Sequence, residues 1–392
     1  MPNPRTPRRK APASPLSPAE IRAFLTELFG DDLHAQRVLS LSRATLGVLT
    51  AGSLGIHAIG RGLAFAMDLH DRHTVKQVDR LFSNAGVDVW SLAASWVPHV
   101  IGDRTKVFVN LDWTEFDEDD QSMLVASMQT NHGRSTPLLW RTVVKSTIAG
   151  HRGEHEDALL VRLREVLPAS VRAVIVADRG FGDSALYPFL EKLDFGYIIR
   201  FRSDVLVTSA DGETRKAGGW LVGSRPRLLR SALVTGEKVP VPTVLVVHAV
   251  GMKQSWCLAT SETGSTAKEL LHHYGKRFTI EEMFRDLKDP RFGMGMTWTR
   301  IGTPLRRDRM LLVAALAQSL LVLLGQAAEN AGIDRMLKTN TSKRRQLSLL
   351  RMGLILYERL PFMREERIRP LMNEFARLVQ LDHALSSALG IK

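Results

Sequence analysis

A carboxylate stands among cations at fixed intervals in the segment YGKRFTIEEMFRDLK. Its members are Tyr274, Arg277, Glu281 and Lys288, separated by two, three and six residues. A carboxylate can bind a divalent metal ion, and arginine and lysine bind phosphate oxygens. A carboxylate that stands among cations at this spacing makes the segment a candidate site for a metal ion or an anion.

The same segment predicts a helix that displays these groups. Thr279 followed three residues later by Glu282 is a capping-box pattern, which predicts a helix start near Thr279. Its buried stripe is expected to be Ile280, Met283, Phe284 and Leu287. Glu281, Arg285 and Lys288 then share another face, because residues at i, i+4 and i+7 are neighbours on a helix. Taken alone, a solvated charged stripe with an i,i+4 ion pair explains this face equally well.

Two upstream runs are predicted to be buried strands that end on aspartate. The run KVFVNLD ends on Asp112, and the run VRAVIVAD ends on Asp178 before a turn. The carboxyl ends of strands form the crevice of an open sheet, where metal and phosphate ligands usually lie. Each aspartate singly has an alternative role as the cap of the following turn. Together with Glu281, the two strand ends predict a three-carboxylate site that turn capping does not explain.

Three carboxylates suit a two-metal mechanism of phosphodiester cleavage, in which one ion activates the hydroxyl and the other stabilises the leaving oxygen. Oxygen ligands with room for water favour Mg²⁺, with Mn²⁺ as a substitute. The histidines form no zinc-binding pattern. The acidic run from Asp117 to Asp120 is expected to lie solvated in a hairpin turn.

These motifs resemble those of the IS-four family of insertion-sequence transposases, whose YREK signature matches Tyr274, Arg277, Glu281 and Lys288. Further blocks that resemble the family are GRSTPLLW (133–140), DRGF (178–181) and WCLATSE (256–262). The blocks occur in the family's order, within about residues 74 to 320. The resemblance is weak in the first and last seventy residues.

The resemblance implies a DDE transposase that cuts an insertion sequence from DNA and joins it to a target. Asp112, Asp178 and Glu281 would be its catalytic metal ligands. Tyr274, Arg277 and Lys288 would hold phosphate at the transposon end, with Arg285 at a position that is often basic in relatives. Trp256 aligns with a tryptophan that stacks on a flipped base in relatives with a hairpin intermediate; a core aromatic is an equally good explanation.

The implied partners are double-stranded DNA with its transposon inverted-repeat ends, target DNA and a second copy of the chain in a homodimer. A catalytically silent end-binding regulator and an RNase H-like nuclease remain as alternatives. The intact carboxylates argue against the first, and the end-binding helices argue against the second.

Composition agrees with a nucleic-acid partner. The 392 residues carry a net charge of +12, with a pI of about 10.1. A basic chain without a basic amphipathic helix is expected to bind nucleic acid rather than a membrane. The single cysteine, Cys257, excludes an intrachain disulfide framework and favours a reducing compartment. The expected location is the bacterial cytoplasm, at the nucleoid.

The predicted fold class is α/β, with an RNase H-like mixed sheet as the catalytic core. The predicted regions are a disordered basic arm (1–18), a helical DNA-binding region (19–100), the first part of the core (101–203), a β-rich insertion (204–254), the second part of the core with the YREK helix (255–325), and a helical C-terminal region for dimerisation or DNA-end contacts (326–392). In the first helical region, a helix opening at Thr74 would present Lys76 and Arg80 to DNA phosphates, although a plain surface helix is an equal alternative. The apolar stretch from Met310 to Leu324 is expected to be a buried core helix.

Overall fold

The computed structural model describes residues 16–381, except 222, 224, 249–251 and 253. The first fifteen residues of the predicted basic arm lie outside this range. By its internal contacts the chain divides into two units: one combines the residues up to Leu92 with those from Asp286 onward, and the other is Ala93–Arg285.

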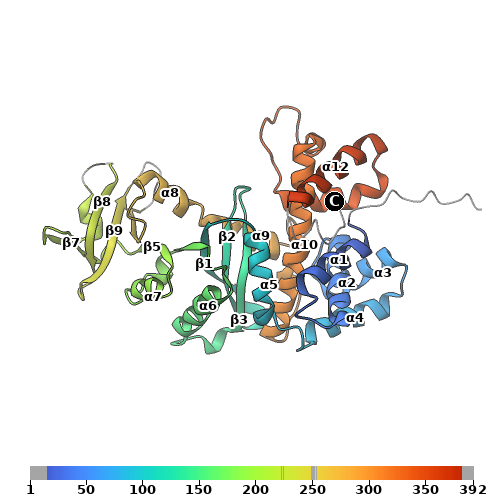
Figure 1. Ribbon diagram of the computed structural model, residues 1–392, viewed down its shortest axis with the longest axis horizontal. Helices are drawn as coiled ribbons and strands as arrows, with labels where there is room; N and C mark the ends of the chain where they lie inside the picture. Colours follow the sequence, from blue (N-terminus) through green and yellow to red (C-terminus); the bar gives the residue numbers. More distant parts are fainter. Residues whose placement is uncertain (1–15, 222, 224, 249–251, 253, 382–392) are drawn as a thin grey trace, which may run out of the picture. The chain divides into compact units, whose positions relative to one another are not determined.

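The first unit is helical (Figure 1). Its N-terminal helices are α1 (Pro18–Phe29), α2 (Ala35–Ala51), α3 (Ile56–Met67) and α4 (Asp71–Ser83). Its C-terminal helices are α10 (Pro304–Asn330), α11 (Leu349–Arg359) and α12 (Glu365–Leu381). Helix α10 contacts α2, α4, α11 and α12, so segments from both ends of the chain share one core.

Local interactions set the starts of two N-terminal helices. The Ser17 side chain and Glu20 form a capping box at the start of α1. Helix α4 begins at Asp71, three residues before the predicted start at Thr74. The reason is that the Thr74 hydroxyl is buried and donates to the Asp71 carbonyl inside the helix. Lys76 and Arg80 are exposed on α4, as predicted.

Helix α10 contains the predicted apolar core stretch. It is 27 residues long and apolar enough to cross a membrane by length and composition, but 78% of its most apolar window is buried inside the fold. Such burial is typical of the core helix of a folded domain. The bent pair α2 and α3 passes the same test only when the two helices are counted as one span, across a 95° bend.

The second unit is built on a ten-stranded mixed sheet with the strand order β3-β2-β1-β4-β5-β10-β9-β8-β6-β7. Strands β1 (Lys106–Phe116), β2 (Gln121–Gln129) and β3 (Ser135–Val144) form an antiparallel meander. Strands β4 (Arg172–Ala177) and β5 (Gly196–Phe201) follow in parallel to β1. The acidic run between β1 and β2 forms the short turn η1 (Asp117–Asp119), as predicted.

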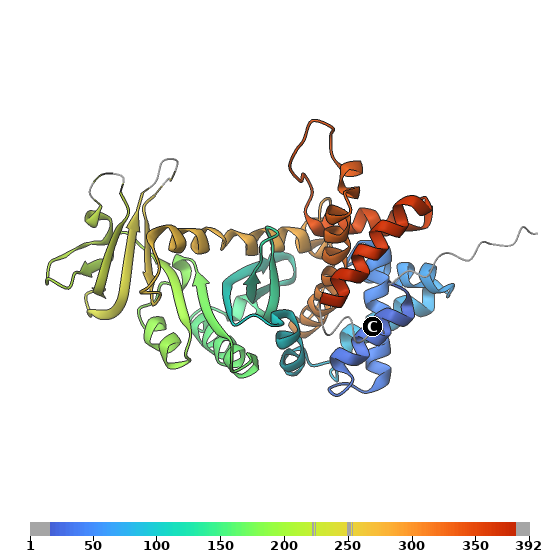
Figure 2. The same cartoon turned by 45° about the horizontal axis from the view of Figure 1, so that its top comes forward.

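Helices cover both faces of this sheet (Figure 2). Helix α8 (Ala267–Gly275) packs Leu270 and Tyr274 against Val174, Val176 and Ile198. Helices α6 (Arg152–Val166) and α7 (Leu186–Lys192) contact the meander and β5, respectively. Because successive side chains of a strand point to opposite faces, β4 is buried on both sides and reads as a continuous apolar run.

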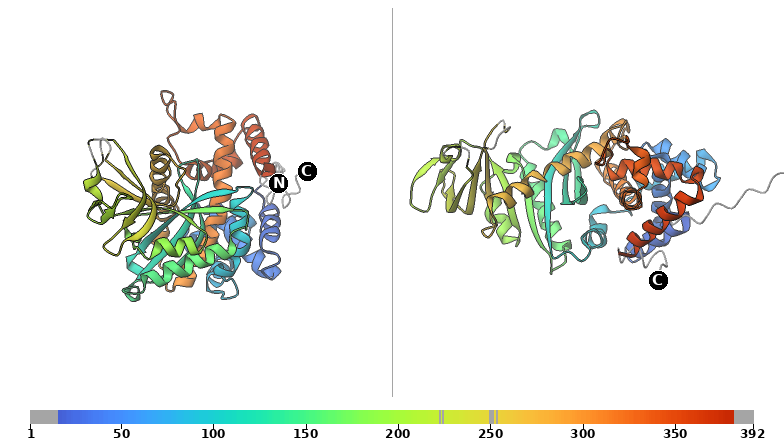
Figure 3. Two further views of the ribbon diagram at one scale, coloured as in Figure 1. Left: turned by 60° about the vertical axis from the view of Figure 1, so that its left-hand side comes forward. Right: turned by 90° about the horizontal axis from the view of Figure 1, so that it is seen from above.

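The segment after β5 extends the same sheet, as the yellow-green strands in Figure 3 show. Strands β6 (Leu206–Thr208), β7 (Thr214–Lys216), β8 (Arg227–Val234) and β9 (Val239–Val247) precede β10 (Trp256–Thr260), which returns beside β5. Among the described residues of 204–254, the only helical turn is η4 (Ala217–Trp220). The β-rich character predicted for this segment is confirmed.

Candidate active site

Asp112 and Asp178 occupy equivalent positions on adjacent parallel strands. The ladder between β1 and β4 ends with the pair Leu111 and Ala177, and the aspartates are the next residue of each strand. The prediction that the first strand ends at Asp112 is wrong, because β1 continues to Phe116 by pairing with β2 alone. Asp112 therefore lies where the parallel pairing ends, and its carboxylate faces the sheet edge expected to bind ligands.

The Asp178 carboxylate also has the capping role considered from the sequence. It is the N-cap of the turn η3 (Arg179–Phe181), and its Oδ1 accepts the Gly180 N–H at 2.7 Å. A Cβ on Gly180 would lie 2.9 Å from that oxygen, so glycine is needed at this position. The turn fixes the direction of the Asp178 side chain, which makes capping and site formation compatible.

Helix α9 (Phe278–Lys288) supplies the third carboxylate, with Ile280, Met283, Phe284 and Leu287 buried as predicted. The predicted capping box at Thr279 is wrong. The Thr279 hydroxyl donates to the Lys276 carbonyl and accepts from the Asn110 amide, because α8 ends only three residues before α9 begins. The chain therefore passes from α8 into α9 through a short turn, and Thr279 is not the N-cap of α9.

Arg277 lies in this turn and links two of the carboxylates. Its guanidinium contacts Asp112 Oδ2 at 3.3 Å and Glu281 Oε1 at 2.7 Å, and its side chain is only 7% exposed. Its Nε is buried without a hydrogen-bond partner among the described residues. Arg285 pairs with Glu282 instead of Glu281, and Glu282 also contacts Arg134. Glu281 therefore faces Arg277 and the aspartates.

Asp112 experiences the charge of both other carboxylates. The net pKa of Asp112 is raised to about 6: burial is the largest cause, Arg277 opposes it, and the like charges of Asp178 and Glu281 add to it. The Trp113 N–H donates to Asp112 Oδ1 at 2.9 Å and favours the ionised form. The three predicted carboxylates thus belong to one electrostatic cluster.

The donor set fits a hard divalent cation in kind, because it consists of oxygen ligands whose mutual repulsion a cation would relieve. The ligands are not assembled around one point. Within the described part of the chain, no three His, Cys, Asp or Glu side chains lie close enough together to hold one ion. The physical reason is Arg277, whose guanidinium lies between Asp112 and Glu281 and supplies the compensating positive charge.

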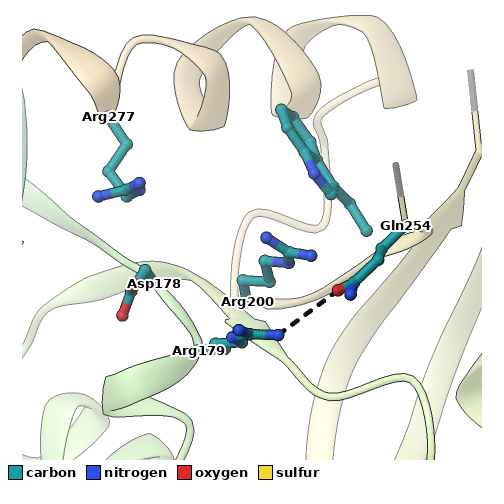
Figure 4. Close-up of a pocket in the computed structure, with 6 residues that line it drawn as sticks. Asp178, Arg179, Arg200, Gln254 and Arg277 are labelled. Atoms are coloured by element: carbon teal, nitrogen blue, oxygen red, sulfur yellow. Dashed lines mark hydrogen bonds between the residues drawn. The ribbon is translucent and has the colours of Figure 1, made fainter. Parts of the chain in front are cut away.

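A pocket of about 340 Å³ opens beside Asp178. Figure 4 shows Arg179, Arg200 and Arg277 around it, with Arg179 hydrogen-bonded to Gln254 at 3.4 Å. Three guanidinium groups around one pocket favour an anion with several oxygen atoms, such as a phosphate.

Trp256 lines the same pocket and is half-buried. Its indole meets the Tyr274 ring edge-on at 4.8 Å, and Arg200 lies over the indole at 6.0 Å. Tyr274 itself is only 1% exposed. Burial raises the pKa of the Tyr274 hydroxyl, which Arg277 and Arg200 partly offset. Trp256 is thus both part of the core and part of a pocket wall, and Tyr274 supports that wall from behind.

Sequence reasoning missed Arg179 and Arg200. Arg179 belongs to the recognised DRGF block, but only the aspartate was given a role. Arg200 is the one charged residue of the otherwise apolar strand GYIIRF. A lone cation in a buried strand needs a polar environment, and this was the available signal.

Three predicted DNA contacts lie in the helical unit. Lys76 and Arg80 are on α4, and Lys288 is the last residue of α9, beyond the boundary between the units. Arg285, the last residue of the sheet-bearing unit, is exposed.

The family model of the transposase DDE domain matches residues 141–318 of the chain. The matched range contains Asp178 and Glu281 and begins after Asp112. A search of curated proteins found no match. The domain match supports a DDE transposase, which is an enzyme of nucleic-acid phosphoryl transfer.

Proposed function

We propose that the chain is a cut-and-paste DDE transposase that cleaves DNA at the ends of an insertion sequence and joins those ends to target DNA. The observation that carries the proposal is the convergence of Asp112 and Asp178, from neighbouring parallel strands, with Glu281 through Arg277. A purely structural ion pair needs one carboxylate, whereas here Asp112 is within electrostatic range of two others, Asp178 after β4 and Glu281 on α9.

In this proposal Asp112, Asp178 and Glu281 hold Mg²⁺, or Mn²⁺ in its place. When bound, the ions would activate the attacking hydroxyl and stabilise the leaving oxygen. Arg277 prepares the site by keeping the carboxylates close together before the ions bind. The half-exposed Glu281 side chain can then leave Arg277 for a ligand position, whereas buried Asp112 has little freedom.

The cationic pocket would hold the phosphate next to the scissile bond. Arg179 and Arg200 are free of carboxylate partners among the described contacts, so they can bind phosphate oxygens without first losing an ion pair. This preorganised positive charge compensates the repulsion between phosphate and carboxylates. The roles of Tyr274, Arg285, Lys288, Lys76 and Arg80 in DNA binding, and of Trp256 in stacking on a flipped base, remain part of the proposal.

The finer classification is also proposed. The strand order β3-β2-β1-β4-β5, with an antiparallel meander followed by parallel strands, supports an RNase H-like core. The YREK spacing supports the IS-four family. A homodimer on two DNA ends and a cytoplasmic location at the bacterial nucleoid are further parts of the proposal.

The test is a cleavage and joining assay on a plasmid that carries both ends of the element, with Mg²⁺ present. We expect the Ala variants of Asp112, Asp178 and Glu281 to lose cleavage while duplex binding is nearly unchanged, because cation-driven affinity does not depend on these carboxylates. Asp119→Ala, which removes a carboxylate from the η1 turn, is the control and should cut normally.

The product pattern separates the alternatives. Joined DNA supports a transposase, nicked or linear DNA without joined product would identify a nuclease, and end binding without any product would identify a silent regulator. A Glu281→Ala variant that cuts at the normal rate would remove the basis of the proposed mechanism.

A further inference from the structure

Large apolar side chains are exposed along one short segment of the helical unit. Trp298 is 78% exposed, Phe292 is 64% exposed and Leu305 is 61% exposed. Aromatic side chains of this size normally bury most of their surface, since their transfer from water is strongly favourable. Several exposed together within one segment indicate a contact surface.

The segment is held in place by its own backbone. The Met294 N–H donates to the Asp286 carbonyl at 2.8 Å, and the Leu54 N–H from outside the segment donates to the Met294 carbonyl at 2.8 Å. The N–H groups of Gly293 and Gly295 both donate to the Asp289 carbonyl. These hydrogen bonds hold the backbone of residues 289–295 in a series of tight turns directly after α9.

Buried side chains alternate with the exposed ones. Met294, Met296 and Ile301 are at most 1% exposed and anchor the segment in the core. Gly295 has a φ of 71°, which places the turn into η5 (Met296–Trp298). The exposure of Phe292 and Trp298 is therefore a consequence of a fixed conformation.

The surroundings of these aromatic residues are cationic. Arg291 and Arg300 are exposed in the same segment. The carboxylate Oδ1 of Asp289 accepts the N–H groups of Arg291 and Phe292 at 2.7 and 2.9 Å, which fixes the backbone of the turn between the two exposed side chains. Just beyond the segment, Arg306 is held by Asp79 and Ser83 of α4. Apolar rings flanked by cations match the bases and phosphates of DNA.

We propose that residues 289–305 form an aromatic DNA-contacting segment, in which Trp298 stacks on or wedges between bases while Arg291 and Arg300 bind phosphates. The inference rests on the proposed function and names a DNA contact outside the carboxylate cluster and its pocket. A second copy of the chain is the other possible occupant. Charge favours DNA, because the core of a protein interface is generally depleted of charged residues.

Binding should be measured by fluorescence anisotropy with a labelled duplex from the DNA flanking the coding region. Trp298→Ala should weaken binding by about tenfold or more, because stacking on a base is lost. Trp298→Phe should stay within about threefold of the wild type, because it keeps an aromatic ring. Phe362→Ala is the matched control: Phe362 is also exposed, at 87%, and lies in the same unit outside the segment.

Tryptophan fluorescence provides a second readout. Trp298 is much more exposed than Trp96, Trp113, Trp140 and Trp220, which are buried. Acrylamide quenching of the wild type should fall when the duplex binds, and Trp298→Phe should lose most of that protection. Equal melting temperatures would show that the variants are folded, as expected for an exposed position.

Unchanged duplex affinity in a folded Trp298→Ala variant would overturn the inference. A change of oligomeric state without DNA would overturn it in favour of a second copy. Neither result affects the proposed function, which depends on the loss of cleavage in the Asp112, Asp178 and Glu281 variants. Conversely, those variants could cut DNA normally while Trp298→Ala still bound weakly.

Discussion

Replacing Arg277 with methionine should destabilise the sheet-bearing unit, because it leaves the Asp112 carboxylate without its cation. Loss of one partner from a wholly buried ion pair costs about 3–5 kcal/mol. Two features reduce this figure. The Asp112 side chain keeps 20% exposure and a hydrogen bond from Trp113, and the half-exposed pair with Glu281 contributes at most about 1 kcal/mol. We expect a loss of about 2–3 kcal/mol.

Urea unfolding followed by circular dichroism would measure this loss. Arg285→Met, on the adjacent helix α9, is the control, because its exposed pair with Glu282 should make the effect less than about 0.5 kcal/mol. A double-mutant cycle with Asp112→Asn should give a coupling of about 1–3 kcal/mol, because each change removes the same interaction. Mg²⁺ should restore part of the stability of Arg277→Met, because a cation that binds only the folded state stabilises it.

Two results would refute the argument. If Arg277→Met unfolds at the same urea concentration as the wild type, Arg277 does not compensate the carboxylates. If the two substitutions are additive, the contact between Arg277 and Asp112 has no energetic weight.

Three further predictions concern DNA binding, the pocket and pH. The affinity for duplex DNA should fall steeply as the salt concentration rises. If the exposed Lys76 and Arg80 bind phosphates, Lys76→Ala and Arg80→Ala should each reduce the slope of log affinity against log salt concentration by about one in a salt titration. If the Trp256 indole stacks on a base, Trp256→Ala should slow hairpin formation by about one to two orders of magnitude and leave nicking intact. If Trp256 only packs against Tyr274 in the core, the rates of nicking and hairpin formation and the melting temperature should all fall together. Burial, followed by the neighbouring cations, lowers the pKa of His273 to about 4, so the unfolded chain binds more protons between about pH 6.5 and 4. His273 should therefore contribute less stability as the pH falls through that window, and the difference between wild type and His273→Phe in urea titrations isolates this contribution from the opposite one of Asp112, whose pKa is raised.

The sequence predicted most elements of the sheet-bearing unit because their signals are local. The apolar runs of β1 and β4 lie close to their predicted positions, and the acidic run forms the turn between β1 and β2, as expected. Asp178 could be placed because a strand, a cap and a turn follow one another directly between Arg172 and Phe181. In contrast, Asp112 lies inside its strand, since β2 continues to pair with β1 after β4 has ended. Pairing between distant segments has no local signal.

The site shows the same limit. The resemblance to the YREK signature predicts a phosphate-binding role for Arg277, but its position between two carboxylates depends on the close approach of α8, α9 and β1. Arg200 lines the pocket beside Trp256 because β10 pairs with β5, and this pairing between distant segments has no signal in the sequence. The exposure of Trp298 was also unpredictable, because an aromatic residue near an apolar helix is normally expected in the core.

The pairing of β5 with β10 has a consequence for how the chain could be shortened. Phe201 and Cys257 are partners in register on neighbouring antiparallel strands, so the segment that forms β6 to β9 begins and ends at nearly the same point of the sheet. A tight hairpin turn could join these strands directly, since antiparallel neighbours need only a short connection. Such a miniature chain would keep Asp112, Asp178 and Glu281 on their own elements but lose Gln254 and the strand that supports Trp256. The long segment between Asp178 and Glu281 therefore contributes one wall of the pocket. Its length could be varied without changing the elements that carry the three carboxylates.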